Sequence, residues 1–196
     1  LRVWRPDIPL LVHRDYDLPP FVREFPGAYS VIASSFSGNT EETISAFRAA
    51  RSLHIPAAVV ATGGALLDEA VSAEAPHIVL PVTGIQPRMS IGLQMKAILK
   101  MLGYDDALRL LGRFRDTFES ARYMGEGEVL AKRLRGYVPI IYASRVNNPL
   151  AYLWKINMNE TGKIPAFANA VPELNHNEMT GFDRAIKTEE LSERFH

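Results

Sequence analysis

The chain has 196 residues, of which 47% are hydrophobic and 22% charged, a composition typical of a globular protein that can bury a core. The 22 basic side chains balance the 22 acidic ones, so we expect neither a nucleic acid nor an anionic membrane as partner. The lack of cysteine excludes disulfides, thiolate metal sites and cysteine nucleophiles. With no signal-like apolar core and no run of transmembrane length, we expect a cytoplasmic protein.

The first half of the chain alternates apolar runs with helical periods. Each run is short, rich in valine or isoleucine and bounded by turn residues, which is typical of buried parallel strands. The predicted strands are residues 8–13, 29–34, 57–61 and 77–80. The predicted helices between and after them are residues 40–53, 66–73 and 88–102, the last ended by Gly103. This alternation predicts an α/β fold with a parallel sheet flanked by helices.

The second half restarts the same alternation after a charged segment. Residues 105–122 predict one long connecting helix, whose apolar stripe includes Leu108, Leu111, Phe114 and Phe118. The elements predicted beyond it are a helix near 126–135, a strand at 138–142, a helix at 149–160 and an extended piece at 164–170. A second, related domain is therefore expected.

One motif carries most of the functional argument. Residues 31–43 read Val-Ile-Ala-Ser-Ser-Phe-Ser-Gly-Asn-Thr-Glu-Glu-Thr, so a strand leads into hydroxyl residues, a glycine and a helix start. The hydroxyls of Ser35, Ser37 and Thr40, the small Gly38 and the free N–H groups of the helix suit a phosphate. The same pattern is also that of a strand-to-helix turn in which Asn39 is the N-cap and Glu42 its capping-box partner. Local chemistry leaves both interpretations open.

The motif resembles the phosphate-binding signature of sugar-isomerase (SIS) domains, and most of all the bifunctional phosphoglucose/phosphomannose isomerases. Further matches follow in family order: Thr62-Gly63-Gly64, Gln86-Pro87-Arg88, Asn157-Met158-Asn159-Glu160 and Pro172-Glu173-Leu174-Asn175-His176-Asn177. The resemblance implies phosphate binding by Ser35, Ser37, Gly38, Asn39 and Thr40.

The resemblance also implies a domain plan. We expect a SIS-type, flavodoxin-like three-layer fold with two SIS domains, both truncated, at residues 1–103 and 123–196, joined by a connecting helix at 104–122. Family members begin with a strand and a Gly-Gly-Ser loop and end with a lysine and a threonine that assist catalysis, and this chain contains neither part. We therefore expect it to be a fragment.

Glu160 is the candidate general base, because by the resemblance it occupies the family's catalytic position. Aldose–ketose isomerisation moves a proton between C1 and C2 through a cis-enediol, which one carboxylate can shuttle. Glu160 stands at the predicted end of a helix, where the negative end of the dipole is expected to raise its pKa. The competing interpretation is an exposed glutamate at a fraying helix end.

The resemblance assigns the remaining chemistry to two cationic side chains. It implies that His176 protonates the ring oxygen during ring opening and reaches the site of a neighbouring subunit, which predicts a homodimer. It implies that Arg88 stabilises the charge of the enediolate. The competing interpretations are a capping or core histidine and an ordinary surface arginine. We expect no cofactor and no metal; Glu173 and His176 have ligand-like spacing but lack an evident third ligand.

The expected function is a cofactor-independent isomerase of glucose 6-phosphate, mannose 6-phosphate and fructose 6-phosphate. Two alternatives remain open at this point. A non-catalytic SIS sensor of sugar phosphates would use the same serine loop, and another SIS enzyme, such as an amidotransferase isomerase domain or a heptose-phosphate isomerase, would share the fold. Glu160 together with His176 favours the isomerase.

Overall fold

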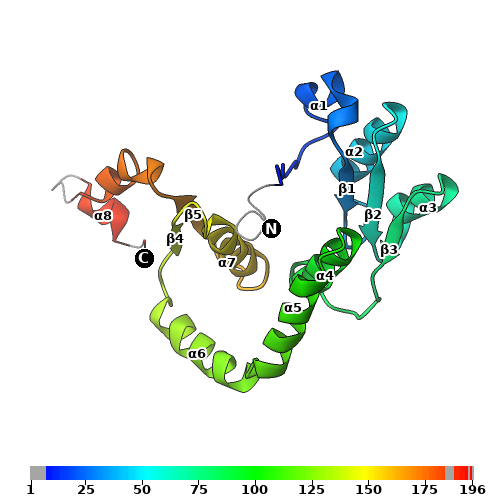
Figure 1. Cartoon of the computed structure of the whole chain (residues 1–196). Coiled ribbons are helices and arrows are strands. Elements are labelled where there is room, and N and C mark those ends of the chain that lie inside the picture. The colour runs from blue at the N-terminus through cyan, green and yellow to red at the C-terminus, as the bar shows by residue number, and fades with distance from the viewer. Residues whose placement is uncertain (1–7, 184–187, 194, 196) are drawn as a thin grey trace. The chain divides into compact units, whose positions relative to one another are not determined.

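The computed structural model describes residues 8–183, 188–193 and 195, and the chain divides into two compact units, Leu1–Phe118 and Glu119–His196 (Figure 1). The boundary between the units lies inside the segment 104–122, where a connecting helix is expected. Among the helices formed by the described residues, none is both long and apolar enough to cross a membrane.

The first unit contains a three-stranded parallel sheet in the order β1-β2-β3. Its elements are α1 (Pro20–Glu24), η1 (Pro26–Ala28), β1 (Val31–Ser34), α2 (Glu41–Ser52), β2 (Ala57–Ala61), α3 (Gly64–Ser72), β3 (His77–Val79), η2 (Pro87–Met89), α4 (Ile91–Met101) and α5 (Asp105–Thr117). The predicted parallel sheet flanked by helices is therefore confirmed.

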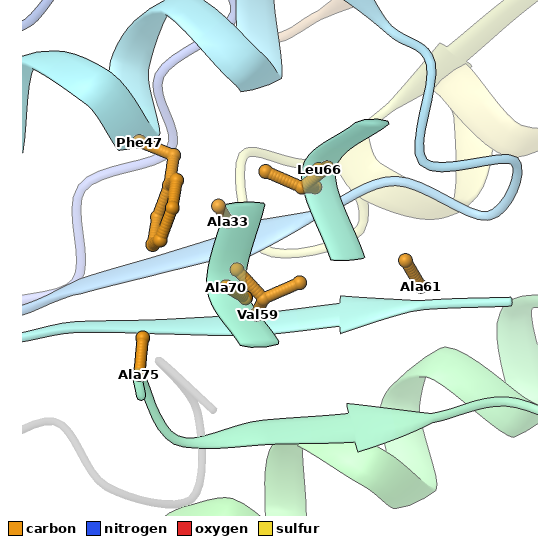
Figure 2. Packing of buried hydrophobic residues seen from close by; sticks show 7 residues of the cluster. All are labelled: Ala33, Phe47, Val59, Ala61, Leu66, Ala70 and Ala75. Atoms are coloured by element: carbon orange, nitrogen blue, oxygen red, sulfur yellow. The ribbon is translucent and has the colours of Figure 1, made fainter. Parts of the chain in front are cut away.

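Alternate residues of the strands face two different helix layers. Ala33, Val59 and Ala61 pack with Phe47 of α2 and Leu66 of α3 in one buried cluster (Figure 2). Two consecutive right-handed crossovers leave their helices on the same face of a sheet, which is why α2 and α3 share one.

The opposite face of the sheet is covered by α4. Val60 of β2 is buried with Leu80 and Ala97, and Ile32 and Ile78 of the neighbouring strands pack against them. The central strand β2 is therefore buried on both faces, and Val59, Val60 and Ala61 are all 0% exposed. A continuous apolar run such as this one is typical of a buried parallel strand.

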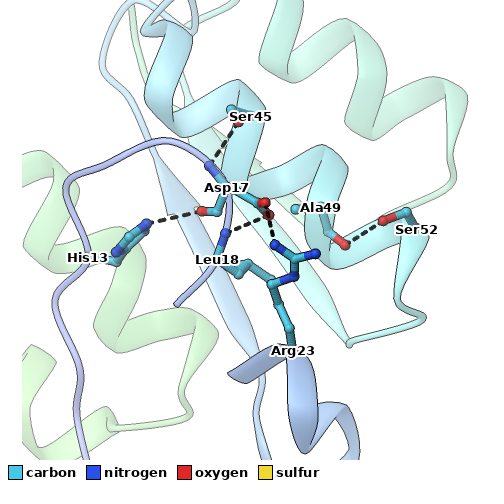
Figure 3. A network of polar contacts seen from close by, with 7 residues as sticks. All are labelled: His13, Asp17, Leu18, Arg23, Ser45, Ala49 and Ser52. Atoms are coloured by element: carbon cyan, nitrogen blue, oxygen red, sulfur yellow. Dashed lines mark hydrogen bonds and ion pairs between the residues drawn. The ribbon is translucent and has the colours of Figure 1, made fainter. Parts of the chain in front are cut away.

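The segment before β1 is fastened to α2 by polar contacts around Asp17 (Figure 3). The Asp17 N–H donates to the Ser45 hydroxyl (2.9 Å), the Asp17 carboxylate accepts from Arg23 (2.9 Å), and the His13 ring contacts the Asp17 carbonyl oxygen (3.0 Å). Leu18 and Val22 are buried beside Ala50 of α2. This segment is thus part of the first unit without adding a strand.

The second unit contains a two-stranded parallel sheet, β4-β5, connected through α7. Its elements are α6 (Ser120–Arg133), β4 (Ile140–Ala143), α7 (Asn148–Glu160), β5 (Phe167–Ala170), η3 (Glu173–Asn175), η4 (Met179–Phe182) and α8 (Glu189–Ser192). Its buried residues include Ala151 of α7, Ala166 before β5 and Leu174 of η3.

Two predicted elements are wrong. Residues 8–13 form no strand, and Leu10, Leu11 and Val12 are 37%, 51% and 58% exposed, so this apolar run pairs with nothing in the sheet. The helix predicted at 105–122 is interrupted, because Phe118 and Glu119 leave the helical conformation with ψ of 111° and 86°. The helix predicted at 88–102 is confirmed as α4, which begins at Ile91, after the 3-10 turn η2 and Ser90.

Candidate active site

The loop of residues 35–40 leaves the carboxyl end of β1 and enters α2. Ser35 is 5% exposed, and its N–H continues the ladder by donating to the Val60 carbonyl (3.0 Å). The Ser35 hydroxyl shares a hydrogen bond with the Thr40 hydroxyl (2.8 Å) and accepts from the Gly38 N–H (3.1 Å). Ser35 therefore stabilises the loop through hydrogen bonds to Thr40 and Gly38. Its direct contact with a phosphate stays a prediction.

Two glycines allow this loop to pack against the loop that follows β2. Gly38 has a φ of +72°, and a Cβ there would lie 1.7 Å from the Gly63 carbonyl oxygen. Gly64 has a φ of +74°, and a Cβ there would lie 2.6 Å from both the Asn39 Oδ1 and the Ser37 carbonyl oxygen. Because both positions combine a left-handed backbone with close approach, a side chain at either one would displace the loop.

Hydrogen bonds across the two loops fix their relative position. The Thr62 N–H and hydroxyl both donate to the Phe36 carbonyl oxygen, at 2.9 and 2.6 Å. The Leu66 N–H donates to the Gly38 carbonyl oxygen (2.9 Å). The Thr62-Gly63-Gly64 segment therefore acts as the support on which the loop of residues 35–40 is built.

Asn39 caps a helix, but not the one that follows it in sequence. Its Oδ1 accepts the Ala65 N–H (3.1 Å) in the first turn of α3. The N-cap of α2 is Thr40, whose side chain makes no capping hydrogen bond. The interpretation of Asn39 and Glu42 as the capping box of α2 is therefore wrong.

The exposed rim of the loop carries donors suited to an anion. The Ser37 hydroxyl oxygen accepts from the Asn39 N–H (3.2 Å), which leaves its own proton for a ligand, and the exposed Thr40 stands at the N-terminus of the 12-residue α2. The positive end of the helix dipole and its first N–H groups favour an anion there. The loop itself contains no lysine or arginine, so hydroxyl and amide donors supply the recognition.

Two carboxylates, Glu41 and Glu42, also lie in the first turn of α2. The Tyr16 hydroxyl donates to Glu41 (3.0 Å), and this hydrogen bond, together with the charge of Glu41, raises the pKa of Tyr16. Tyr16 thereby directs one of the two carboxylates toward the segment that precedes β1.

Arg88 occupies the middle of the 3-10 turn η2 and is half-buried. The turn is closed by the Met89 N–H, which donates to the Gln86 carbonyl (2.9 Å), and by the Ser90 N–H, which donates to the Pro87 carbonyl (3.0 Å). Arg88 belongs to the same unit as the loop of residues 35–40. Its predicted role at the enediolate stays a prediction.

Three residues near this turn, Ser34, Ser90 and Gln94, carry no functional signature in the sequence. The Ser34 hydroxyl at the end of β1 donates to the Gln94 Oε1 (3.0 Å), and the Gln94 Nε2 donates to the Ser90 hydroxyl oxygen (2.6 Å). Ser90 is 0% exposed. The only signal in the sequence is a polar residue at position 94 within an apolar helix, which does not identify its partner.

Glu160 is the last residue of α7, as predicted, and it is exposed. The helix end is held by the Gly162 N–H, which donates to the Asn157 carbonyl (3.1 Å). The neighbouring Asn159 accepts the N–H of the buried Ala166 through its side chain (2.8 Å). Asn159 therefore joins the end of α7 to the chain entering β5, and this fixes the backbone on which Glu160 stands.

His176 is the residue that ends η3, the turn after β5, and it is exposed. Its N–H donates to the Glu173 carbonyl (3.0 Å), and the buried Leu174 anchors the turn. Asn177 donates to the Glu173 carboxylate (3.1 Å) through its side chain. His176 is thus presented on an ordered turn, and the interpretation of it as a core histidine is wrong.

The predicted residues fall into two groups. The first unit brings together Ser35, Ser37, Gly38, Asn39 and Thr40 in one loop and also carries Arg88, whereas Glu160 and His176 belong to the second unit. Within the described ranges, no group of three or more His, Asp and Glu side chains could hold a metal ion.

Comparison with known proteins identifies relatives of both units. The profile of the bacterial phospho-glucose isomerase C-terminal SIS domain matches residues 124–196. A bifunctional phosphoglucose/phosphomannose isomerase of Aquifex aeolicus is 36% identical over 89% of this chain and 53% of its own length. A D-glucosamine-6-phosphate 4-epimerase of Sulfolobus acidocaldarius is 32% identical over 76% of this chain and 50% of its own length. The chain thus spans about half the length of these curated relatives.

The fold has a counterpart among solved structures. The tagatose-6-phosphate ketose/aldose isomerase of Escherichia coli superimposes with a TM-score of 0.53 at 19% identity, over 81% of this chain and 49% of that one. This likeness confirms the predicted SIS-type fold. Together with the sequence matches across most of the chain, it shows that this chain belongs to the SIS-domain family of the bifunctional phosphoglucose/phosphomannose isomerases.

Proposed function

We propose that the protein containing this chain is a cytoplasmic, cofactor-independent isomerase that interconverts glucose 6-phosphate and mannose 6-phosphate with fructose 6-phosphate. The observation that carries the proposal is the loop of residues 35–40. Its hydroxyl and amide donors sit at the carboxyl edge of a buried sheet and at a helix N-terminus, locked in place by the loop after β2. A ligand whose fixed handle is a phosphate suits this arrangement.

The phosphate is held by the rim of that loop. Ser37 and Thr40 donate hydroxyl protons, the amide groups at the start of α2 donate along the helix axis, and Gly38 lets the loop that presents them pack against Gly63. Ser35 and Asn39 stabilise the conformation of the loop. Ser35 is hydrogen-bonded to Thr40 and Gly38, and Asn39 is hydrogen-bonded to Ala65. Binding the phosphate fixes the distance from this handle to C1 and C2 of the sugar, which is how a remote group contributes to catalysis.

Glu160 then moves the proton between the two carbons. Its carboxylate removes the proton from C2 of the open-chain aldose while O1 gains a proton, which gives the cis-enediol. The same group then returns its proton to C1 while the C2 hydroxyl loses its own, which gives the ketose, so the proton lost from O2 balances the one gained by O1. Arg88 stabilises the negative charge that develops on the enediolate oxygen. No bond to the protein forms, and no net proton is gained or lost.

His176 opens the sugar ring before this step by protonating the ring oxygen as the bond to C1 breaks. A histidine exchanges protons in the physiological pH range, which suits a group that must both give and recover one. We propose that it does so in the site of a neighbouring copy, within a homodimer. The exposed turn that carries His176 supports this role, since its side chain is accessible from outside its own unit.

Proton NMR in D2O tests the proposal directly. Fructose 6-phosphate incubated with the full-length protein is expected to yield glucose 6-phosphate, and mannose 6-phosphate, carrying deuterium at C2. The Glu160→Gln variant is expected to lose about 10²–10⁴-fold in kcat, whereas Glu128→Gln, an exposed glutamate in α6, keeps wild-type turnover. Saturable sugar-phosphate binding without conversion would contradict the isomerase and favour a sensor.

The epimerase relative motivates a second candidate, a 4-epimerase of an amino-sugar phosphate. It would use the same phosphate loop with different chemistry at the sugar. Supplying glucosamine 6-phosphate in the same NMR experiment distinguishes the two, because epimerisation at C4 inverts a different carbon from the one that the isomerase exchanges.

A further inference from the structure

A continuous chain of hydrogen bonds joins the end of β1 to the turn that carries Arg88. It runs from the Ser34 hydroxyl to Gln94 Oε1 (3.0 Å), from Gln94 Nε2 to the Ser90 hydroxyl oxygen (2.6 Å), and from the Ser90 hydroxyl to the Pro87 carbonyl oxygen (2.5 Å). Ser34 immediately precedes the phosphate loop, and the Pro87 carbonyl belongs to the peptide bond that leads into Arg88.

The direction of each hydrogen bond in this chain is determined by chemistry. The Pro87 carbonyl can only accept, so the Ser90 hydroxyl donates its single proton to it. The Ser90 oxygen must therefore accept from Gln94. The Gln94 amide group therefore faces Ser90, and its carbonyl oxygen faces Ser34, which has to donate. An unambiguous set of donors and acceptors holds one geometry, because any reversal leaves two groups of the same kind facing each other.

Burial at Ser90 limits the movement of this chain of hydrogen bonds. Ser90 is 0% exposed, and among the described residues it and Ser35 are the buried polar ones. Gln94 is also held by its own helix, since its N–H donates to the Ser90 carbonyl (3.0 Å). On the same helix, Ala97 is buried against Val60 of β2. Ser34 and Gln94 are half-buried, so the link lies partly shielded between the sheet and α4, and the loss of Gln94 would leave the fully buried Ser90 hydroxyl without one of its partners.

We infer that Gln94 is a positioning residue that sets the place of Arg88 relative to the phosphate loop, through Ser90 on one side and Ser34 on the other. The inference rests on the proposed isomerase function and on the role proposed there for Arg88. The phosphate loop follows one end of this link and Arg88 follows the other. The distance between the bound phosphate and Arg88 must stay constant for Arg88 to stabilise the enediolate, since a small displacement of a catalytic group lowers the reaction rate strongly.

The variant that tests the inference is Gln94→Met, which keeps the length of the side chain and removes both hydrogen bonds. In the full-length protein we expect kcat to fall about tenfold or more, while the inhibition constant of inorganic phosphate changes by less than about twofold. Lys96→Met, an exposed site on the same helix, is the matched control and keeps wild-type kinetics. Ser34→Ala, which removes a single hydroxyl, is expected to change kcat in the same direction.

A double-mutant cycle separates positioning from a general structural role. In an Arg88→Ala background, Gln94→Met is expected to cost no further activity, because the group that it positions is gone. An equal loss in both backgrounds, an unchanged kcat for Gln94→Met, or a phosphate affinity that weakens in step with kcat would each overturn the inference. Wild-type protein without turnover would instead overturn the proposed function, and this inference with it.

Discussion

The two units of the chain differ in how completely they enclose their sheets. In the first unit, β2 is covered on both faces and its last three residues are 0% exposed, whereas no residue of β4 or β5 is buried in the second. Every cluster of buried hydrophobic residues found among the described residues belongs to the first unit. The second unit has two strands and α7, with isolated buried positions such as Leu174.

This difference teaches where a precise site can be built. The loop of residues 35–40 is supported by a packed three-layer body and by a second loop interlocked with it. Glu160 and His176 stand instead at the end of α7 and on the short turn η3, both exposed. Close-packed interiors resist displacement, so we expect the first unit to hold the phosphate and Arg88 rigidly. For Glu160 and His176, the proposed proton-transfer groups, we expect less rigid positions, because the elements that carry them are less enclosed.

The largest expected effect comes from a buried aromatic residue. Phe47 of α2 is 1% exposed in the main cluster of the first unit, while Phe167 of β5 is 53% exposed. We expect Phe47→Ala to lower the free energy of unfolding by about 3–5 kcal/mol, because it leaves a cavity. Phe167→Ala should cost no more than about 1 kcal/mol. Urea denaturation measures both, and equal losses would contradict the contrast between the units.

A smaller effect is expected at the interlocked loops. Gly38→Ala places a Cβ against the Gly63 carbonyl and forces a left-handed alanine, so it should destabilise the protein by about 2–4 kcal/mol and abolish protection by phosphate. Gly127 lies inside α6 with open space around it, and Gly127→Ala should stabilise by about 0.5–1 kcal/mol. Thermal denaturation with and without phosphate gives both values. A fully stable, phosphate-responsive Gly38→Ala would show that the loops are not locked together.

The smallest effect is expected at Tyr142 of β4, whose hydroxyl is buried and has no hydrogen-bond partner among the described residues. Burial raises the pKa of Tyr142, and the nearby Glu178 carboxylate raises it further, first as an acceptor for the phenol and then through its charge, although the pair does not reach the geometry of a regular hydrogen bond and the carboxylate is engaged by the Asn169 amide. Tyr142→Phe should change the free energy of unfolding at pH 7 by no more than about 1 kcal/mol, because no regular hydrogen bond is lost.

The same variant has a predictable dependence on pH. Above about pH 10, an unfolded tyrosine ionises while the folded Tyr142 still holds its proton, so wild-type stability falls as pH rises through this range. Tyr142→Phe should remove that part of the loss, and Tyr152→Phe, on the exposed side of α7, should not. Parallel alkaline denaturation curves for all three proteins would show that Tyr142 is not the group responsible.

Local patterns were enough to predict much of the fold. The strand at residues 57–61 was predicted with its observed bounds, and α2, α3 and α7 were predicted to within a few residues. Their periods, turn residues and apolar runs act within a few positions of the chain. The same patterns failed at 8–13, where an apolar run lacks a sheet partner, and at Phe118–Glu119, where no glycine or proline marks the break.

Contacts between residues far apart in the sequence are seen only in the folded structure. The chemistry of the hydroxyl-rich loop and its place between a strand and a helix were readable from residues 31–43 alone, because neighbouring residues create them. The choice of Asn39 to cap α3 rather than α2, and the link from Ser34 to Gln94 across 60 residues, were not. Both contacts depend on which loop or helix packs beside the edge of the sheet. That packing is decided by the burial of the whole first unit, and local propensity does not determine it.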